Sequence, residues 1–236
     1  MKSYDSISYL MQTILDVPMY EGVGTLAHDI ARPPTAPPGL DHTMTLIGAS
    51  IAWVQLPLSN LTYIHFTPVT DYLQLLAAAS TDMNFTTGPF SLAAWIYLES
   101  IATDKFIIER GLAATDGWIF AVNSTGQIYV LTNQAGFSQV STTAAGAITI
   151  SGWWFVGATR LAGSVRLYRN GVDVTSVANV HTDPTGNAAR NLQVGADNAL
   201  VSTWDGYISR PMVFGRQISP LEMYKLFESS RDFYGI

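Results

Sequence analysis

The sequence has no cysteine, few charged residues and no long apolar run. Without cysteine there is neither a disulfide framework nor thiolate chemistry. Only 13% of the 236 residues are charged, against about 25% in ordinary domains, and the 12 Lys and Arg form no basic stripe. Because the net charge is also −6, nucleic-acid binding through phosphate neutralisation is not expected. No apolar stretch approaches about 18 residues, so no membrane insertion is expected.

The shortage of charge is matched by a hydrophobic content of 48%. A sandwich or barrel has much surface, so this balance indicates that part of the surface contacts protein. The alternative is a neutral surface rich in Ala, Gly and Thr. The first twelve residues lack the basic segment and apolar run of a secretory signal, so no secretion signal is expected.

Short strands separated by turn residues fill the region from Phe90 to Phe214. The segment from Phe90 to Tyr97 is apolar on both of its faces, as in the centre of a sandwich. Hairpin loops are expected at residues 123–126, 162–163 and 170–171, and the last is Asn-Gly, the strongest two-residue hairpin pattern. This spacing predicts an all-β fold of two antiparallel sheets. Four residues are expected in its core: Trp95, Val156, Leu167 and Ile208.

Two segments have helical patterns. Near the C-terminus, Ser219 is a good N-cap, Pro220 suits the first helical position, and Glu222 completes a capping box. The short helix that follows should cover one end or edge of the sandwich. Near the N-terminus, apolar residues at helical spacing predict an assembly arm over residues 1–15 that packs on a neighbouring subunit: Ile7, Leu10, Met11, Ile14 and Leu15. The alternative for residues 13–17 is an opening β-strand.

Several motifs resemble the concanavalin A-like lectin/glucanase superfamily, in its laminin-G and pentraxin-like form. They are the strand "FSLAAWI" from Phe90, the hairpin "WWFVGAT … LYRNG" from Trp153 and the closing "GYI … RQISPLEM" from Gly206. Upstream, "EGVG" from Glu21 and "DYL" from Asp71 stand in the same order as in the family. The resemblance implies a jelly-roll sandwich over residues 16–236, and the fold hosts lectins, hydrolases and adhesion modules.

Catalytic patterns are missing where the family's enzymes carry them. Glycosidases of this fold resemble one another in a strand of the form E-x-D-x-x-E, because hydrolysis needs two carboxylates flanking the bond. The five glutamates here have no aspartate two residues later, and no G-x-S-x-G motif occurs. The chain is therefore predicted not to be an enzyme. No pair of carboxylates about 5–10 Å apart, one with a raised pKa, is expected in a groove.

Metal ligands are similarly scattered. His28-Asp29 and Asp41-His42 flank a proline-rich loop from Arg32 to Gly39 and could supply imidazoles and carboxylates to a metal, or hydrogen-bond to their neighbours. Calcium-binding relatives suggest seven loop residues as oxygen ligands: Asp82, Asn84, Asp104, Asp116, Asp197, Asn198 and Asp205. Because these residues are spread out and suit turns, no metal and no cofactor are expected.

Tryptophan offers the clearest binding candidates. Trp154, Trp204 and Trp118 could stack on sugar or contact a partner, whereas burial between the sheets is the alternative for each. Trp153 and Trp154 are neighbours on a strand, so they face opposite sides. An outward Trp154 would be a sugar platform or a protein contact.

These observations lead to two hypotheses of function. The first is a structural or adhesion protein of a viral particle, as a phage capsid-decoration, tail or fibre component whose partners are protein subunits. It depends on the absence of a signal, on the absence of cysteine, and on the closing segment from Leu226 to Tyr234, which resembles phage-encoded members of the family. The second is a soluble carbohydrate-binding module whose partner is a glycan. The expected location under the first hypothesis is the virion.

Overall fold

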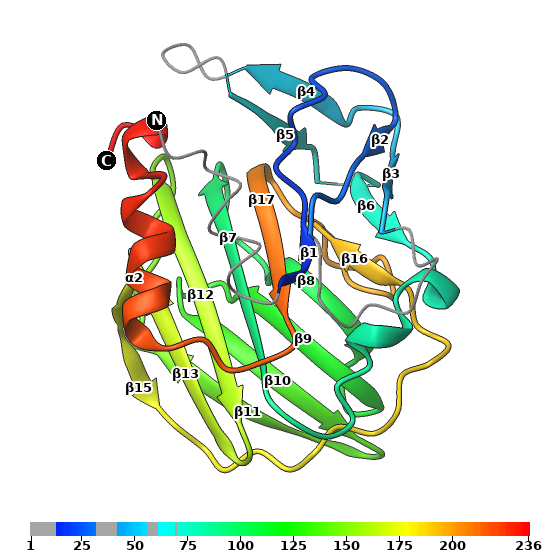
Figure 1. Ribbon diagram of the computed structural model, residues 1–236, viewed down its shortest axis with the longest axis vertical. Helices are drawn as coiled ribbons and strands as arrows, with labels where there is room; N and C mark the ends of the chain where they lie inside the picture. Colours follow the sequence, from blue (N-terminus) through cyan, green and yellow to red (C-terminus); the bar gives the residue numbers. More distant parts are fainter. Residues whose placement is uncertain (1–12, 32–41, 56–60, 69) are drawn as a thin grey trace.

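The computed structural model describes residues 13–31, 42–55, 61–68 and 70–236. Within them, two antiparallel β-sheets pack face to face, as predicted (Figure 1). Sheet A has the strand order β14 (Val172–Asp173), β13 (Ser164–Arg169), β12 (Trp153–Leu161), β7 (Phe90–Leu98), β17 (Gly206–Phe214), β5 (Thr62–Phe66) and β4 (Ala52–Gln55). Strand β1 (Thr13–Asp16) also pairs with β17.

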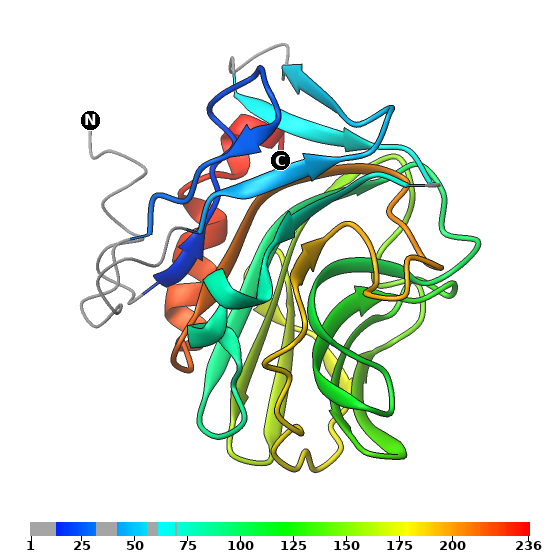
Figure 2. The ribbon, with the colours of Figure 1, turned by 90° about the vertical axis from the view of Figure 1, so that its right-hand side faces the viewer.

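Sheet B forms the opposite layer of the sandwich (Figure 2). Its strand order is β15 (Thr175–Val177), β11 (Phe137–Thr143), β10 (Ile128–Gln134), β9 (Asp116–Val122), β8 (Lys105–Leu112), β16 (Leu192–Val194), β6 (Tyr72–Leu75), β3 (Met44–Ile47) and β2 (Leu26–Ala27). Short 3₁₀ turns η1 (Ala77–Ala79) and η2 (Thr81–Met83) follow β6. The first and last strands of the described chain, β1 and β17, both belong to sheet A, and sheet B is built from strands that lie between them in the sequence, from β2 to β16.

The hairpins form where the sequence predicts them. Asn170 and Gly171, both with positive φ, join β13 to β14, and Ala162-Gly163 joins β12 to β13. The inter-sheet core contains Val156, Leu167 and Ile208, as expected. Trp95 is also fully buried but belongs to a second cluster, on the other side of sheet A.

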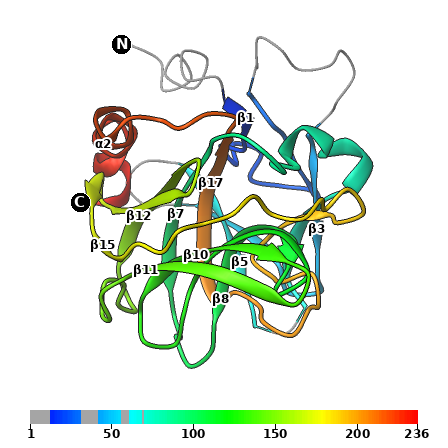
Figure 3. The same ribbon diagram turned by 90° about the horizontal axis from the view of Figure 1, so that it is seen from below.

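Helix α2 (Pro220–Glu228) covers that second cluster. Ser219 and Glu222 form the predicted capping box at its start. The helix covers the outer face of sheet A at its β14 edge, as expected (Figure 3). Gly157 of β12 leaves room for Met223, and the turn at Gly171 lies against Tyr224. After α2, the 3₁₀ turn η3 (Arg231–Tyr234) stacks Tyr234 on Trp95, with ring centroids 4.0 Å apart. The molecule thus has three layers on the α2 side: helix, sheet A and sheet B.

The N-terminal prediction is wrong for Ile14 and Leu15, which lie in strand β1 and not in a helix. The cause is tertiary: the edge of β17 offers backbone hydrogen bonds to residues 13–16, and Asp16 forms a buried ion pair with Arg210 at 2.8 Å. Leu15 packs in the core of its own sandwich, so it does not belong to an arm. The other arm residues, Ile7, Leu10 and Met11, lie outside the described residues.

Candidate functional site: an aromatic row on the outer face of sheet A

Four aromatic side chains lie side by side across sheet A, one from each of four neighbouring strands. The register places His65 of β5 opposite Tyr207 of β17, Tyr207 opposite Tyr97 of β7, and Tyr97 opposite Trp153 of β12. Alternation along each strand turns these residues away from sheet B, since their neighbours Ile64, Ile96 and Ile208 pack in the inter-sheet core. We call these four residues, with Tyr63 beside them, the aromatic row.

The rings of the aromatic row touch one another in sequence. Ring centroids are 4.7 Å apart for His65 and Tyr207, 5.3 Å for Tyr207 and Tyr97, and 5.7 Å for Tyr97 and Trp153. Tyr63 meets both Trp153 and Tyr207 edge to face. Such contacts hold the rings in fixed orientations. All members except Tyr63 are partly exposed, so the row presents a pre-organised surface.

A carboxylate closes one end of the aromatic row. Glu99, directly after β7, places its Oε2 3.2 Å from His65 Nε2, and its side chain is 40% exposed. The phenol of Tyr207 also bonds to Glu99, and burial together with this contact raises the pKa of Tyr207 to about 12. Burial likewise raises the pKa of Tyr63, with added repulsion from Tyr97 and Glu99. At neutral pH the row therefore offers neutral phenols beside a fixed negative charge.

The C-terminal segment borders the aromatic row. Tyr234 of η3 packs on Trp153 with ring centroids 4.9 Å apart, and its hydroxyl donates to Ser209 at 2.7 Å. The indole of Trp95 donates to Ser230 at 3.0 Å. Helix α2 and η3 thus cover one part of the outer face of sheet A and leave the aromatic row beside them partly open to solvent.

Two of the predicted tryptophans cannot form a platform. Trp118 and Trp204 are both fully buried. The indole of Trp118 donates to the carbonyl of Met83 at 3.0 Å, and that of Trp204 donates to the carbonyl of Tyr97 at 3.3 Å. Each indole has its polar atom satisfied inside the protein, which is the arrangement of a structural tryptophan. The prediction that they contact sugar or a partner is therefore wrong.

Trp154 is turned the other way from its prediction. It is partly buried and packs against the inter-sheet core, its indole donates to the carbonyl of Thr149 at 3.1 Å, and the guanidinium of Arg169 lies 5.2 Å from its ring centre. Its neighbour Trp153 is the outward residue. The sequence predicted that one of the two faces outward, but the register of β12 against β7 decides which one.

His42 is held between two carboxylates rather than in a metal site. Its Nδ1 lies 3.1 Å from Asp29 and its Nε2 3.3 Å from Asp82. Burial alone would lower the pKa of His42, but the two carboxylates outweigh it and raise the pKa to about 10. His28 pairs instead with Glu21 at 2.9 Å. Asp41 and the proline-rich loop lie outside the described residues.

The suggested calcium ligands serve local contacts. Asp116 pairs with Arg190 at 3.0 Å, Asp104 accepts from Tyr129 at 3.0 Å, and Asp197 accepts from two backbone N–H groups of its own loop. In the part of the chain that the structure describes, no three His, Asp or Glu side chains gather as metal ligands.

No helix among the described residues is long and apolar enough to cross a membrane.

The outer face of sheet B carries a buried carboxyl group. Glu109 of β8 is 1% exposed, and burial raises its pKa to about 8. Its Oε1 accepts from the backbone and side chain of Asn198, and Asp197 lies close enough to act on its charge. A carboxyl group with a raised pKa is what an acid catalyst would need. Here, however, the carboxyl groups of Glu109 and Asp197 both hold the loop at residues 196–203 in place. The arrangement anchors a loop over the sheet and leaves Glu109 closed to a substrate.

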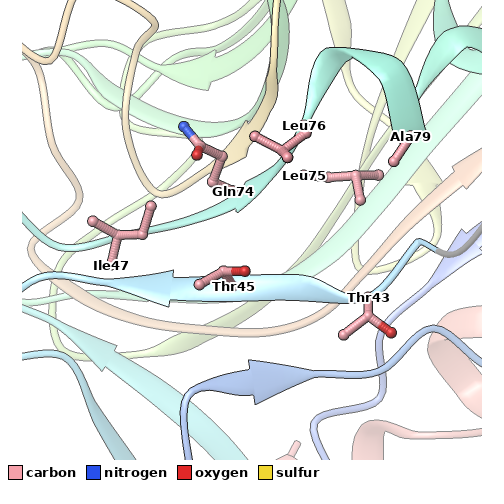
Figure 4. A pocket seen from close by; sticks show the side chains of 7 residues that line it. All are labelled: Thr43, Thr45, Ile47, Gln74, Leu75, Leu76 and Ala79. Atoms are coloured by element: carbon pink, nitrogen blue, oxygen red, sulfur yellow. The ribbon is translucent and has the colours of Figure 1, made fainter.

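A shallow pocket of about 300 Å³ lies further along the same face, between β3, β6 and η1 (Figure 4). Its polar groups are two threonines and the amide of Gln74, and its other walls are aliphatic. The lining residues are Thr43, Thr45, Ile47, Gln74, Leu75, Leu76 and Ala79. The pocket has neither a ring nor a charge, so it offers fewer recognition groups than the aromatic row.

A serine–histidine pair lies between the sheets. Ser141 Oγ is 2.8 Å from His181 Nε2, and Thr132 Oγ1 is 2.9 Å from His181 Nδ1. Burial lowers the pKa of His181 to about 4. Ser141 is fully buried and His181 is almost so, which makes this pair a satisfied core histidine and not a nucleophile with its base.

Comparisons with known proteins fit this fold. A laminin-G-type sequence profile, described as the concanavalin A-like lectin/glucanases superfamily, matches residues 69–223. No curated protein sequence matches the chain. The matched region contains most of both sheets and all of the aromatic row except Tyr63 and His65.

Solved structures of botulinum neurotoxin binding domains share the fold. The receptor-binding domain of botulinum neurotoxin D has a TM-score of 0.67 at 14% identity, with 97% of this chain and 54% of that chain covered. The binding domain of neurotoxin DC, in complex with rat synaptotagmin II, has a TM-score of 0.63 at 12% identity, covering 96% and 52%. A structure from work on neurotoxin type C, whose cell entry depends on two ganglioside molecules, has a TM-score of 0.62 at 13% identity, covering 96% and 53%. This chain spans about half the length of these proteins, and the likeness is one of fold.

Proposed function

Because this chain belongs to the concanavalin A-like lectin/glucanases superfamily, we propose that it is a non-enzymatic binding module that recognises glycans through the aromatic row. The observation that carries the proposal is the alignment of partly exposed rings across four strands, from His65 to Trp153. Tyr and Trp present an apolar face together with a polar tip, and a sugar ring has the complementary pattern of C–H faces and hydroxyls.

The polar groups at the end of the aromatic row complete the site. Glu99 offers acceptors, and His65 and the phenols offer donors and acceptors around the rings. Binding sites for small molecules combine apolar walls with a few fixed polar groups in this way. The ganglioside named for neurotoxin type C supports a glycan as the class of ligand, since that protein shares the fold.

Replacing each of two neighbouring tryptophans by alanine, in separate variants, tests this function. Trp153→Ala removes one end of the aromatic row, whereas Trp154→Ala removes the same side chain from the opposite face of β12. On a glycan array, followed by calorimetry on the best neutral oligosaccharide, we expect Trp153→Ala to weaken binding at least about tenfold, roughly 1.4 kcal/mol. Trp154→Ala should stay within about threefold of the wild type.

Two controls separate binding from stability. Thermal melting of each variant shows whether the sandwich is intact, and Phe137→Ala removes an exposed aromatic side chain from sheet B. Loss of binding by Trp154→Ala or Phe137→Ala but not by Trp153→Ala would place the site elsewhere. If no glycan binds the wild-type chain, the proposed function is wrong.

A place in a viral particle remains our second proposal, supported by sequence only. The closing segment from Leu226 to Tyr234 resembles phage-encoded members of the family, and it forms the end of α2 and η3. A virion component that binds glycans would serve adhesion, so the two proposals are compatible. Mass spectrometry of purified virions, with the copy number of this chain, tests the location: we expect it at a fixed stoichiometry, and its absence would refute the proposal.

A further inference from the structure

The aromatic row carries one fixed charge, and that charge is negative. The side chain of Glu99 is held by His65 on one side and by the phenol of Tyr207 on the other. The groups that act electrostatically on the phenols of Tyr63 and Tyr207 are Glu99 and other phenols. A carboxylate held by two partners and 40% exposed repels any anion that approaches the rings.

Cations that could offset this charge have other partners. Lys105, the first residue of β8, donates to the carbonyl of Thr203 at 3.1 Å. Arg231 of η3 pairs with Glu228 and Asp232. Among the described residues, the arginines that lie over aromatic rings are Arg160 and Arg169, and their rings, Phe90 and Trp154, are not in the aromatic row. Within the described parts of the chain, an acidic sugar would therefore find no arginine or lysine stacked on the rings to receive its carboxylate.

The length of the aromatic row also bears on the ligand. It spans four adjacent strands, which are three spacings of about 4.8 Å or roughly 14 Å in all. That is longer than a single sugar ring. Rings in contact along this whole line can stack on successive units of an oligosaccharide, with Glu99 and His65 at one end and Trp153 at the other.

We infer that the aromatic row selects neutral oligosaccharides over sialylated ones and that Glu99 is the residue that sets this selectivity. The inference rests on the proposed function of the same site. It assigns to Glu99 a positioned charge that acts on the ligand, held in place by His65 and Tyr207. It also predicts a ligand preference that differs from that of the neurotoxin of type C, whose named ligand is a ganglioside.

Matched glycan pairs test the inference on the full chain. Each pair consists of a neutral oligosaccharide of four to six sugars and the same oligosaccharide capped with sialic acid, both titrated by calorimetry. We expect the wild type to bind the neutral member about tenfold more tightly, because like charges repel at short range. In Glu99→Gln, which keeps the shape and removes the charge, this ratio should fall to near one.

Titrations at high salt, and a control variant that loses a negative charge elsewhere, distinguish charge repulsion of the sialylated glycan from a steric preference for the neutral one. The ratio in the wild type should shrink at about 1 M salt, where exposed charges are screened within about 3 Å, whereas a steric preference would persist. Asp173→Asn removes one negative charge from β14, at the far edge of sheet A, and should leave the ratio unchanged.

The possible outcomes separate the selectivity of the aromatic row from its ability to bind glycans at all. If sialylated glycans bind as well as neutral ones, or if Glu99→Gln keeps the wild-type ratio, the selectivity inference is overturned and glycan binding stands. If neither member of any pair binds, the proposed function fails and the inference falls with it.

Discussion

The outer face of sheet A is lined by aromatic rings, whereas the outer face of sheet B has a glutamate and amides in a similar row. On sheet B, paired positions run from Ile119 through Glu109, Gln193 and Gln74 to Thr45. That row is closed near its centre, where the loop at residues 196–203 bonds to Glu109. The row on sheet A has Glu99 at its end and stays partly exposed. A row of side chains across a sheet is thus open to a ligand only where no loop or helix covers it.

The cover over each face also differs in origin. On sheet A, α2 and η3 cover part of the face with Met223, Phe227 and Tyr234, all supplied by the chain directly after β17. On sheet B, a loop between β16 and β17 bonds to a buried carboxyl. The first cover packs on the sheet through apolar side chains, and the second depends on a buried carboxyl group that can titrate.

The largest effect is expected beneath the helix. Trp95→Ala removes a fully buried indole that stacks on Tyr234 and bonds to Ser230. We expect the free energy of unfolding to fall by about 3–5 kcal/mol, as for other buried Trp to Ala changes. Urea unfolding followed by circular dichroism measures it. A loss below about 1 kcal/mol would mean that α2 and η3 contribute little to the cover of sheet A.

A smaller, pH-dependent effect is expected on sheet B. The pKa of Glu109 in the folded protein is about 8, above its ordinary value of 4.5, so between these pH values the folded state holds a proton that the unfolded chain releases. The free energy of unfolding of the wild type should therefore decline as pH rises from about 4.5 to about 8, by a few kcal/mol at most.

Glu109→Gln keeps the shape of the protonated side chain and cannot ionise. Its free energy of unfolding should lack the part of the decline that belongs to Glu109. The stability of the variant relative to the wild type should therefore increase as pH approaches 8. Urea unfolding at pH 5, 6.5 and 8 measures both proteins. Parallel pH profiles would contradict the assignment of a raised pKa to Glu109.

The smallest effect on stability is expected within the partly exposed aromatic row. Tyr207→Phe keeps the ring in the aromatic row and removes the bond to Glu99. The loss of stability should be about 0.5–1.5 kcal/mol, the usual worth of one hydrogen bond. Glycan affinity should drop several-fold by calorimetry. Unchanged affinity together with a loss of selectivity would show that Tyr207 acts on the ligand only through Glu99.

Local patterns in the sequence predicted the fold well. The Asn170-Gly171 turn and the Ser219 capping box each depend on residues close together in the chain, and both form as predicted. The prediction for Ile14 and Leu15 failed because a helical stripe and a buried strand both need apolar residues, and the free edge of β17 decided between them. That edge is some 200 residues away in the sequence.

The candidate site was harder to predict, for the same reason. The aromatic row exists because β5, β17, β7 and β12 align His65, Tyr207, Tyr97 and Trp153, and these strands are distant in the sequence. A one-residue shift in register would have turned Trp154 outward instead. The alternation of Trp95 and Tyr97 with Leu92, Ala94 and Ile96 was a usable local pattern, since it placed aromatic rings on one face of β7. It could not say that α2 would cover Trp95 and leave Tyr97 partly exposed.

The six tryptophans of the chain provide the most direct test of the central claim, that glycans bind on the outer face of sheet A. Each indole N–H gives its own signal in a ¹H–¹⁵N NMR spectrum, and the six lie in different parts of the sandwich. On titration with a neutral oligosaccharide, we expect the signal of Trp153 to shift most, with little change for Trp118 and Trp204, which are buried and bonded to backbone carbonyls. A titration in which Trp153 stays unchanged while another indole shifts would contradict the claim.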